Sequence, residues 1–375
     1  MVASLTPCSL LFSSSSSSPS SSCGCPTLPF SLCLLPASES VLPGDVTAII
    51  QASPDRLPQL KHFASLYGGP VCAVIFIRSA AEELSTLASH LEDPAMMRFV
   101  DLHLVYGGHP KTEDYPVNML RNVAMHLSRT DLVLLLDVDF MPMPDMHTRM
   151  RYWGSKILES GDSSQLSRLT AFCVPAFQTI SGVSDSSNVP TSKVELMQHV
   201  LDNRVQPAHI FKASVAHKPT DFHKWFRQPD SRPFEVAFTE GFEPYVMVRR
   251  SSIALPQFDE RFAGYGHDKV AQLFEMHLAG FKFVILPDVF IVHLEHGQPR
   301  WRAQQNWTRV WLNWYGFKSE MDWKYPDPAA DQSAPAPGKR RQCGLGAQLS
   351  RSNTASDLHA VKLLPQLLGV GRNVG

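Results

Sequence analysis

The stretch DLVLLLDVDFMPMPD, residues 131–145, is the strongest indication of both the fold and the position of a site. Its apolar run is typical of a buried parallel strand, which we place at residues 131–137. The run ends in two carboxylates, Asp137 and Asp139, which are two positions apart and therefore point the same way. We expect them at the carboxyl end of the strand, where α/β sheets bind ligands. Two hard oxygen ligands suit Mn²⁺ or Mg²⁺, and such an ion can also bind phosphate oxygens. The alternative interpretation is that the two aspartates only cap a turn.

Strands and helices alternate on the N-terminal side of this stretch. The patterns predict strands at 46–50, 71–77 and 99–106, and helices at 54–66, 79–90 and 118–127. This order predicts an α/β domain with a mostly parallel central sheet flanked by helices. On the C-terminal side we expect strands at 169–175, 245–249, 281–286 and 289–293, and a helix at 267–280 that Gly280 ends as a C-cap.

Composition divides the chain into three parts. Residues 1–44 are rich in Ser and Pro and carry no charge before Glu39, which predicts a low-complexity segment. Residues 45–325 hold the predicted domain, and residues 326–375 are predicted to be a disordered tail. The apolar patches near the N-terminus are too short to span a bilayer, and no basic residue precedes Arg56. Neither a membrane anchor nor a targeting signal is therefore evident.

The overall charge and the cysteines argue against a nucleic-acid-binding protein and against a protein with a structural zinc site. The net charge is −1 and the sequence pI is about 6.9, whereas a nucleic-acid-binding protein normally has a basic face and a high pI. Hydrophobic residues make up 44% of the chain, which is enough for a large core. No CxxC pair supports a structural zinc site, and Cys72, within an apolar run, is expected to be a small buried residue.

A second candidate metal-binding segment is LPDVFIVHLEH, residues 286–296. A short apolar run ends at His293, and a neutral imidazole complements two carboxylates as a ligand for Mn²⁺. His296, three residues further on, is a rival ligand. Taken alone, a histidine at such a position is more often part of the core or of a turn.

Carboxylates also gather around the segment Gly264-Tyr265-Gly266. Asp259, Glu260 and Asp268 flank this flexible loop, which is suited to bring a carboxylate close to a bound sugar. The alternative is an N-cap aspartate with solvated neighbours.

Three polar residues lie on the helix predicted before residues 131–145. Arg121 is suited to bidentate phosphate contacts and so to a diphosphate, or else it forms a structural ion pair. Asn118 and Asn122 are candidates for contacts with a base or ribose, or else they are surface amides.

Five motifs in this order, YPVNMLRNVAM, LLLDVDFMP, FEPYVMVRR, LPQFDERFAGYGHDK and LPDVFIVH, resemble glycosyltransferase family 49. This family includes the glucuronyltransferase domain of the LARGE-type enzymes and a stand-alone β-1,4-glucuronyltransferase. The resemblance covers residues 45–320. It implies a GT-A fold with a single nucleotide-sugar transferase domain, a UDP-sugar donor, Mn²⁺ dependence, inversion at the anomeric carbon, and a place in the Golgi lumen.

The resemblance also assigns roles to single residues. Asp137, Asp139 and His293 match the metal ligands, with Mg²⁺ as the alternative to Mn²⁺. Asp137 and Arg121 are expected close to the UDP-sugar. The segment FDERFAGYG is expected to face the acceptor.

An inverting transferase needs a general base that deprotonates the acceptor hydroxyl. Asp268 is the first choice because it follows the glycine loop, and Glu260 and Asp259 are the alternatives. The resulting hypothesis is transfer of glucuronate from a UDP-sugar to a glycan or glycoprotein acceptor.

Other hypotheses stay open. They are transfer of another sugar such as xylose or N-acetylglucosamine, a retaining reaction, a catalytically silent glycan-binding protein of the same fold, and a metal-dependent phosphohydrolase.

Overall fold

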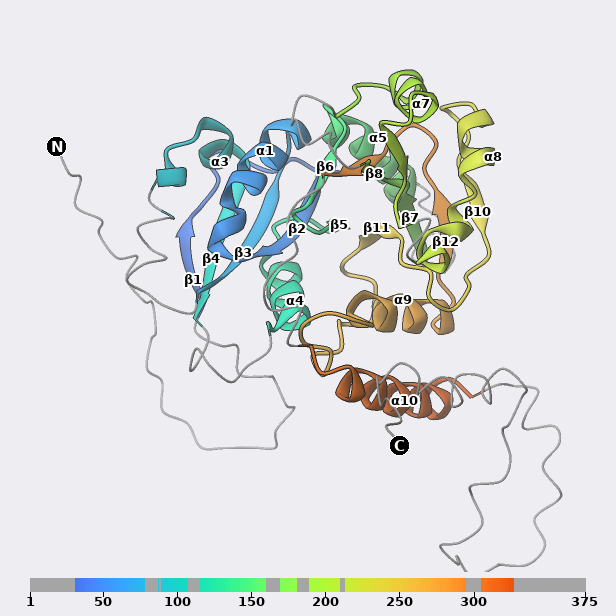
Figure 1. The fold of residues 1–375 in the computed structure, drawn as a ribbon. Helices are drawn as coiled ribbons and strands as arrows, with labels where there is room; N and C mark the ends of the chain where they lie inside the picture. Colours follow the sequence, from blue (N-terminus) through green and yellow to red (C-terminus); the bar gives the residue numbers. More distant parts are fainter. Residues whose placement is uncertain are drawn as a thin grey trace, which may run out of the picture. The chain divides into compact units, whose positions relative to one another are not determined.

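The computed structural model describes eight parts of the chain, residues 31–77, 87, 89–106, 115–159, 169–180, 189–209, 213–294 and 305–326. The described residues up to Tyr325 belong to one compact unit, and a second unit begins at Pro326 (Figure 1). Most of the helix predicted at 79–90 lies outside the described residues.

A nine-stranded sheet forms the centre of the unit (Figure 1). In sheet order its strands are β1 (Ser31–Leu35), β4 (Val100–Tyr106), β3 (Val71–Ile77), β2 (Val46–Ala52), β5 (Leu132–Leu135), β11 (Tyr245–Arg249), β7 (Thr170–Val174), β12 (Lys282–Ile285) and β10 (Phe234–Val236). Strands β4, β3, β2 and β5 are parallel, as are β7 and β12, and the remaining pairings are antiparallel. The predicted parallel sheet is therefore found in the first half, and the complete sheet is mixed.

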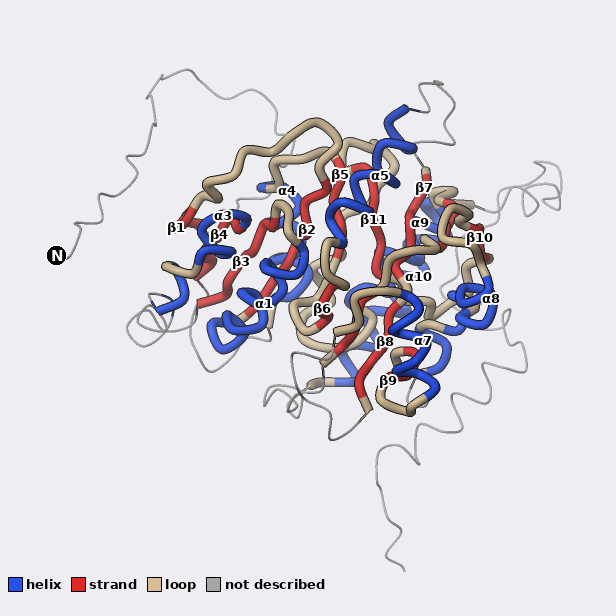
Figure 2. The backbone as a smooth tube through the Cα atoms, turned by 90° about the horizontal axis from the view of Figure 1, so that it is seen from above, coloured by secondary structure: helices blue, strands red, loops and turns tan. Residues whose placement is uncertain are grey.

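Helices cover both faces of this sheet (Figures 1 and 2). Helix α1 (Leu57–Tyr67) packs with α5 (Met146–Glu159) on one face, and α4 (Val117–Leu127) packs with α9 (Asp268–Leu278) on the other. The order of the parallel strands reverses between β2 and β5, because β3 and β4 extend the sheet to one side of β2 and β5 lies on the other. In α/β sheets such a reversal marks the crevice where ligands bind.

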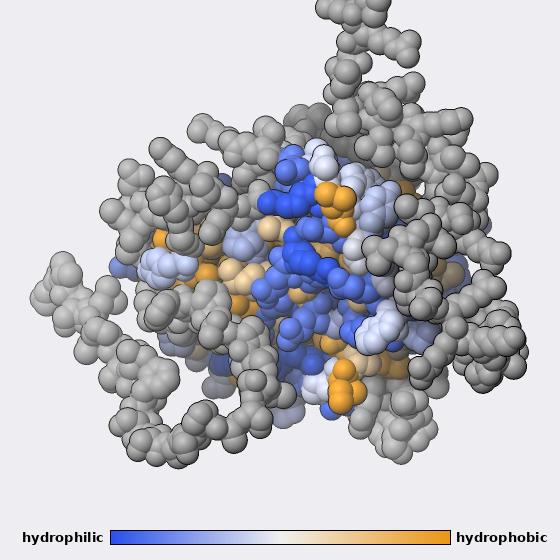
Figure 3. All heavy atoms as spheres, turned by 90° about the horizontal axis from the view of Figure 1, so that it is seen from below, coloured by the Kyte–Doolittle hydropathy of each residue, from blue (hydrophilic) through white to orange (hydrophobic). Residues whose placement is uncertain are grey.

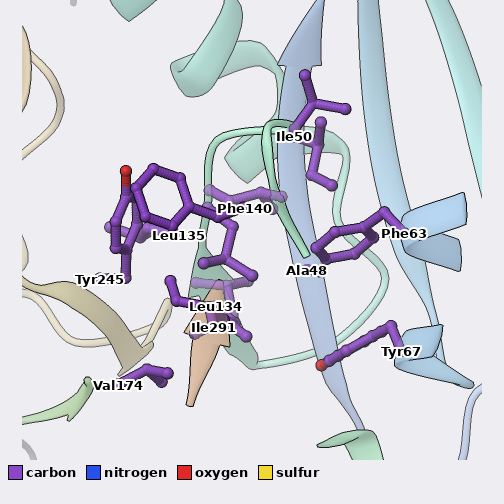
Figure 4. Close-up of a cluster of buried hydrophobic side chains, with 14 of the residues drawn as sticks. Ala48, Ile50, Phe63, Tyr67, Leu134, Leu135, Phe140, Val174, Tyr245 and Ile291 are labelled. Carbon is purple, nitrogen blue, oxygen red and sulfur yellow. The ribbon is translucent and has the colours of Figure 1, made fainter. Parts of the chain in front are cut away.

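A second sheet extends from the end of β5. Its strands are, in order, β6 (Phe140–Pro142), β13 (Ile291–His293), β8 (Ala176–Thr179) and β9 (Val205–Pro207). Phe140 pairs with His293 in the register of β6 and β13. The Phe140 ring packs 4.6 Å from the Tyr245 ring, and Figure 4 shows both beside Leu135. The core therefore continues from the large sheet into the small one and fixes the segment between β5 and β6.

The remaining elements of the described residues are mostly short helices. They are the helices α3 (Pro94–Phe99), α7 (Lys193–Leu201) and α8 (Phe222–Arg227), the long helix α10 (Trp307–Lys324), and the 3₁₀ helices η1 (Pro54–Arg56), η3 (Ser214–Ala216) and η4 (Lys218–Thr220). Within the described residues, none of the helices has the length and apolar character that a bilayer crossing requires.

Helix α10 packs on α9 through a small core of its own. Trp314, Phe317 and Met321 of α10 are buried against α9, whereas Trp311 and Tyr315 are exposed. Figure 3 views the molecule from below, the side on which α10 lies in Figure 1. The part of this face that the grey atoms leave visible is mainly hydrophilic, and its hydrophobic residues appear as separate spots.

Candidate active site

Asp137 and Asp139 lie where β2 and β5 end side by side. Strand β5 stops at Leu135, so Asp137 and Asp139 follow it directly, and Arg56 follows β2 in η1. The Arg56 guanidinium lies 3.2 Å from an Asp139 carboxylate oxygen and so joins the two strand ends by an ion pair. The site therefore occupies the reversal in strand order that the fold predicts for a ligand crevice.

Asp137 is held by three side chains from three elements. Its Oδ1 accepts a hydrogen bond from Arg121 of α4 at 2.8 Å. Its Oδ2 accepts one from the Tyr245 hydroxyl of β11 at 2.9 Å and one from Lys269 of α9 at 2.8 Å. Burial by itself raises the pKa of Asp137, but Lys269 and Arg121 outweigh it and hold this pKa well below its ordinary value. Asp137 therefore stays ionised.

Arg121 links Asp137 to Asp268. Its second guanidinium nitrogen lies 2.7 Å from Oδ2 of Asp268, and its side chain is only 8% exposed. Burial lowers the pKa of Arg121, but the two carboxylates outweigh burial and raise it above its ordinary value. The site thus contains a charge-balanced group of two cations and two carboxylates. We call it the Asp137 network, and its members are Arg121, Lys269, Asp137 and Asp268.

The amides of Asn118 and Asn122 hold the loop before α9 against α4. Asn118 is fully buried and donates to the backbone carbonyls of Asp259 and Asp268 at 2.8 and 2.9 Å. Asn122 exchanges two hydrogen bonds with the backbone of Phe258, each 2.9 Å long. In this structure both amides support the loop, and their predicted contact with a nucleotide stays a prediction.

The three candidate bases differ in the hydrogen bonds and ion pairs that their carboxylates form. Asp268 accepts from Arg121 and from the backbone N–H of Gly266, at 2.7 and 3.3 Å. Asp259 is paired with Arg261, whose guanidinium lies 2.6 Å from its Oδ2. Glu260 accepts from Asn122 at 2.9 Å. None of the three roles is tested by these contacts, but each carboxylate already has a partner within the chain.

His293 approaches Asp139 through the pairing of β6 and β13. The backbone N–H of Leu294, the next residue, donates to the Asp139 carbonyl at 3.4 Å, and the His293 ring lies 4.9 Å from the Phe140 ring. Asp139 and His293 thus lie on adjacent segments, and their predicted role as metal ligands stays a prediction. His296 lies outside the described residues.

The predicted metal ligands do not form a complete set of protein ligands in this structure. Within the described ranges, no group of three or more His, Cys, Asp or Glu side chains is arranged to hold a metal ion. Both oxygens of Asp137 accept hydrogen bonds, and one oxygen of Asp139 faces Arg56. Asp139 and His293 still offer a carboxylate and an imidazole, and divalent cations at nucleotide sites often take their other ligands from phosphate oxygens and water.

Sequence reasoning missed several polar residues of this site: Arg56, Glu243, Tyr245, Lys269 and His217. Lys269 lies in the first turn of α9, where the helix dipole disfavours a cation. This unfavourable position is the one feature of the sequence that could have indicated a role for Lys269. His217 is buried, and its ring lies 6.4 Å from the Tyr245 ring. Burial, followed by the charges of Lys269 and His209, lowers the pKa of His217 to about 3, so this imidazole is neutral.

A pocket opens beside the Asp137 network. The residues lining it come from α4, the end of β5, β11, α9 and the loop before α9, and they include Arg121, Asp137, Tyr245, Phe258 and Lys269. A hollow in contact with fixed charges can orient a polar ligand.

Comparison with known proteins identifies the class to which this site belongs. Residues 108–326 match the family described as "Glycosyl-transferase for dystroglycan". The glycosyltransferase-like protein gnt14 of Dictyostelium discoideum is 35% identical over 257 residues, which are 68% of this chain and 38% of that protein. The xylosyl- and glucuronyltransferase LARGE1 of Danio rerio is 34% identical over 253 residues, covering 67% of this chain and 31% of that protein. Among solved structures, GalNAc-T7 with UDP, GalNAc and Mn²⁺ aligns with a TM-score of 0.37 at 8% identity, over 67% of this chain and 44% of that chain.

The chain therefore belongs to glycosyltransferase family 49, as its motifs predict. Its architecture is the α/β class predicted from the sequence, with a large central sheet flanked by helices. The chain spans about a third of the length of the relatives named above.

Proposed function

We propose that this chain is a metal-dependent, inverting glycosyltransferase that moves a sugar from a UDP-sugar to a hydroxyl group of a glycan. One observation carries the proposal: the crevice between the ends of β2 and β5 holds Asp139 beside His293, next to the Asp137 network. This crevice is where α/β sheets bind nucleotides. Membership of family 49 supports the reaction class.

The metal ion would be held by Asp139 and His293 together with oxygens of the diphosphate. An imidazole ligand favours Mn²⁺ over Mg²⁺, which prefers oxygen ligands alone. When bound, the metal would offset the negative charge that develops on the departing UDP. Asp137 remains the expected third ligand, although in this structure it is neutralised by Arg121 and Lys269.

The chain's own residues would bind and orient the UDP-sugar. Arg56, which pairs with Asp139 at 3.2 Å and with Asp55 at 3.6 Å, would bind a phosphate of the donor. The Asp137 network would keep the end of β5 and the start of α9 in fixed positions. Such preorganised charges stabilise a transition state without reorganising during the reaction.

Glucuronate is the sugar that we propose, with xylose and N-acetylglucosamine as alternatives. The name of the zebrafish relative joins xylosyl and glucuronyl transfer. A glucuronate carboxylate needs a cation, and Arg56, Arg121 and Lys269 all lie within this site. We further propose that the acceptor is a glycan or glycoprotein and that the protein works in the Golgi lumen.

Release of UDP by the purified full chain tests this proposal. The chain is incubated with UDP-glucuronate, UDP-xylose or UDP-N-acetylglucosamine, with Mn²⁺ or with EDTA. We expect release from one of these donors that stops in EDTA and falls at least about 100-fold in Asp139→Ala and in His293→Ala. The control is Asp202→Ala, because the Asp202 carboxylate pairs with Arg204 and Gln198 on the surface.

Two outcomes would contradict this proposal. Release that persists in EDTA would show that the reaction does not require a metal ion. No release from any of the three donors, together with no binding of UDP, would favour the catalytically silent glycan-binding protein.

A further inference from the structure

Glu243 is a partly buried carboxylate beside the Asp137 network. It lies just before β11, and its backbone N–H donates to the Ala216 carbonyl at 2.8 Å. Because Pro244 follows it, Glu243 favours an extended conformation. An extended segment would carry the Glu243 and Tyr245 side chains on the same side, and Tyr245 reaches Asp137.

Charged groups from three elements influence the Glu243 carboxylate electrostatically. They are Lys269 and Asp268 from α9, Asp137 at the end of β5, and Arg121 from α4. The neutral His217 lies next to Ala216, the residue that accepts from the Glu243 backbone. Glu243 therefore belongs to the same site, although its motif FEPYVMVRR indicated no role for it.

The Glu243 carboxylate differs from its neighbours because it has no hydrogen bond to any residue that the structure describes. Asp137, Asp268, Asp259 and Glu260 all accept hydrogen bonds from side chains of the chain. Glu243 is also not among the sealed, unpartnered polar atoms of the described residues, so its oxygens keep contact with solvent. A general base needs such a lone pair, open toward the group that it deprotonates.

We propose that Glu243 is the general base of the transfer reaction, an inference that rests on the proposed function. A Glu243 oxygen takes the proton of the acceptor hydroxyl while the acceptor oxygen forms its bond to the anomeric carbon. The bond between that carbon and the phosphate oxygen breaks, and its electron pair leaves with UDP. Asp268, which is bound to Arg121, then acts as a positioning residue for the network.

The protonation behaviour of Glu243 agrees with this role. Burial raises the pKa of Glu243, and the neighbouring Asp268 and Asp137 raise it further, while Lys269 and Arg121 lower it. The net change is upward, toward the pH at which a base works best. The Asp137 network thus supplies both the negative charges that make Glu243 more basic and the cations that keep it ionised.

Replacing the carboxylate by an amide tests the proposal. In Glu243→Gln we expect kcat for transfer to fall about 10²- to 10⁴-fold. The KM for the UDP-sugar and the affinity for UDP with Mn²⁺, measured by calorimetry, should stay within about threefold of the unmodified chain. The residual activity of Glu243→Gln should lack the acidic limb that the pH–rate profile of the unmodified chain shows. Glu243→Asp should recover part of kcat.

Matched variants separate this role from the alternatives. Glu240→Gln is the control, because Glu240 lies three residues earlier and pairs with Lys318 at the surface. Asp268→Asn and Glu260→Gln test the rival bases. The proposal is overturned if Glu243→Gln keeps kcat near the unmodified value, or if UDP affinity falls in step with kcat. If the unmodified chain transfers no sugar at all, the proposed function fails and this inference fails with it; activity retained in Glu243→Gln contradicts the inference alone.

Discussion

Lys269 occupies a position that is unfavourable for a lysine, and its partners explain why it is there. The first turn of α9 carries the positive end of the helix dipole. Burial lowers the pKa of Lys269, but Asp137, Tyr245 and Glu243 outweigh burial and raise it well above its ordinary value. The Lys269 ammonium also lies 4.3 Å from the centre of the Tyr245 ring. A single residue therefore joins α9 to both β5 and β11.

Replacing Lys269 by methionine should destabilise the fold. The change keeps the length of the side chain but leaves Asp137 with Arg121 as its remaining cation. We expect a loss on the order of 2 kcal/mol, below the ~3–5 kcal/mol for a fully broken buried pair because Arg121 stays. Denaturant unfolding measures it, with Lys282→Met as the control. Lys282 pairs with Glu235 at the surface, where about 0–1 kcal/mol is typical. Equal losses in both variants would show that the Asp137 network contributes no more than a surface pair.

Glu243 should make stability depend on pH in the direction opposite to Asp137. Because burial raises its pKa, its stabilising contribution is present at low pH and is lost as the pH rises through that raised value. Glu243→Gln should therefore unfold at a higher temperature than the unmodified chain at pH 8 and at a similar temperature at pH 4. Thermal unfolding at the two pH values checks this. A lower midpoint at pH 8 would mean that the ionised carboxylate stabilises the fold.

At the scale of elements, the end of α9 shows local chemistry that sequence predicts well. Gly280, predicted as the C-cap, has φ +90°, and its N–H donates to the His277 carbonyl at 3.0 Å. The N–H of Phe281 donates to the Met276 carbonyl, also at 3.0 Å, which completes the paired hydrogen bonds of a Schellman motif.

Two glycines should respond to alanine with opposite signs. Gly280→Ala should destabilise by about 1–2 kcal/mol, because an L-residue is strained in the left-handed region. Gly316→Ala should stabilise by about 0.5–1 kcal/mol, because Gly316 is inside α10 and an added Cβ would meet no other atom within 4 Å. Chemical denaturation of both variants measures the two changes. A loss at Gly316 as large as that at Gly280 would contradict the helix geometry described.

Sequence predicts elements that depend on local pattern and misses those that depend on tertiary contacts. The apolar runs of β2, β3 and β5 are confirmed as buried strands. Helix α10 was not predicted, because exposed Trp311 and Tyr315 stand beside buried Trp314 and blur its apolar stripe.

The Asp137 network illustrates the same limit at the site. Its hydrogen bonds join residues 16 to 147 positions apart. No local pattern predicts them, so the sequence identified Asp137 and Arg121 as candidates but not the pairing between them.

At the scale of the whole molecule, residues from nearly the full length of the described unit converge on one crevice. Arg56 comes from the connection after β2, Asp137 and Asp139 from the segment after β5, and His293 from the end of β13 in the second sheet. Because the large sheet brings β2, β5 and β11 together, the fold itself places a carboxylate pair, an imidazole and three cations at one edge. This arrangement and membership of family 49 are the basis of the account.

Whether a metal ion helps this chain to bind UDP can be measured by titration calorimetry on the full chain with Mn²⁺ and then with EDTA. We expect binding that weakens at least about tenfold in EDTA and to the same extent in Asp139→Asn with Mn²⁺ present. Asp202→Asn, the surface control, should bind as the unmodified chain does. UDP binding that is equally strong in EDTA, or unchanged in Asp139→Asn, would contradict a metal-bridged diphosphate at the ends of β2 and β5.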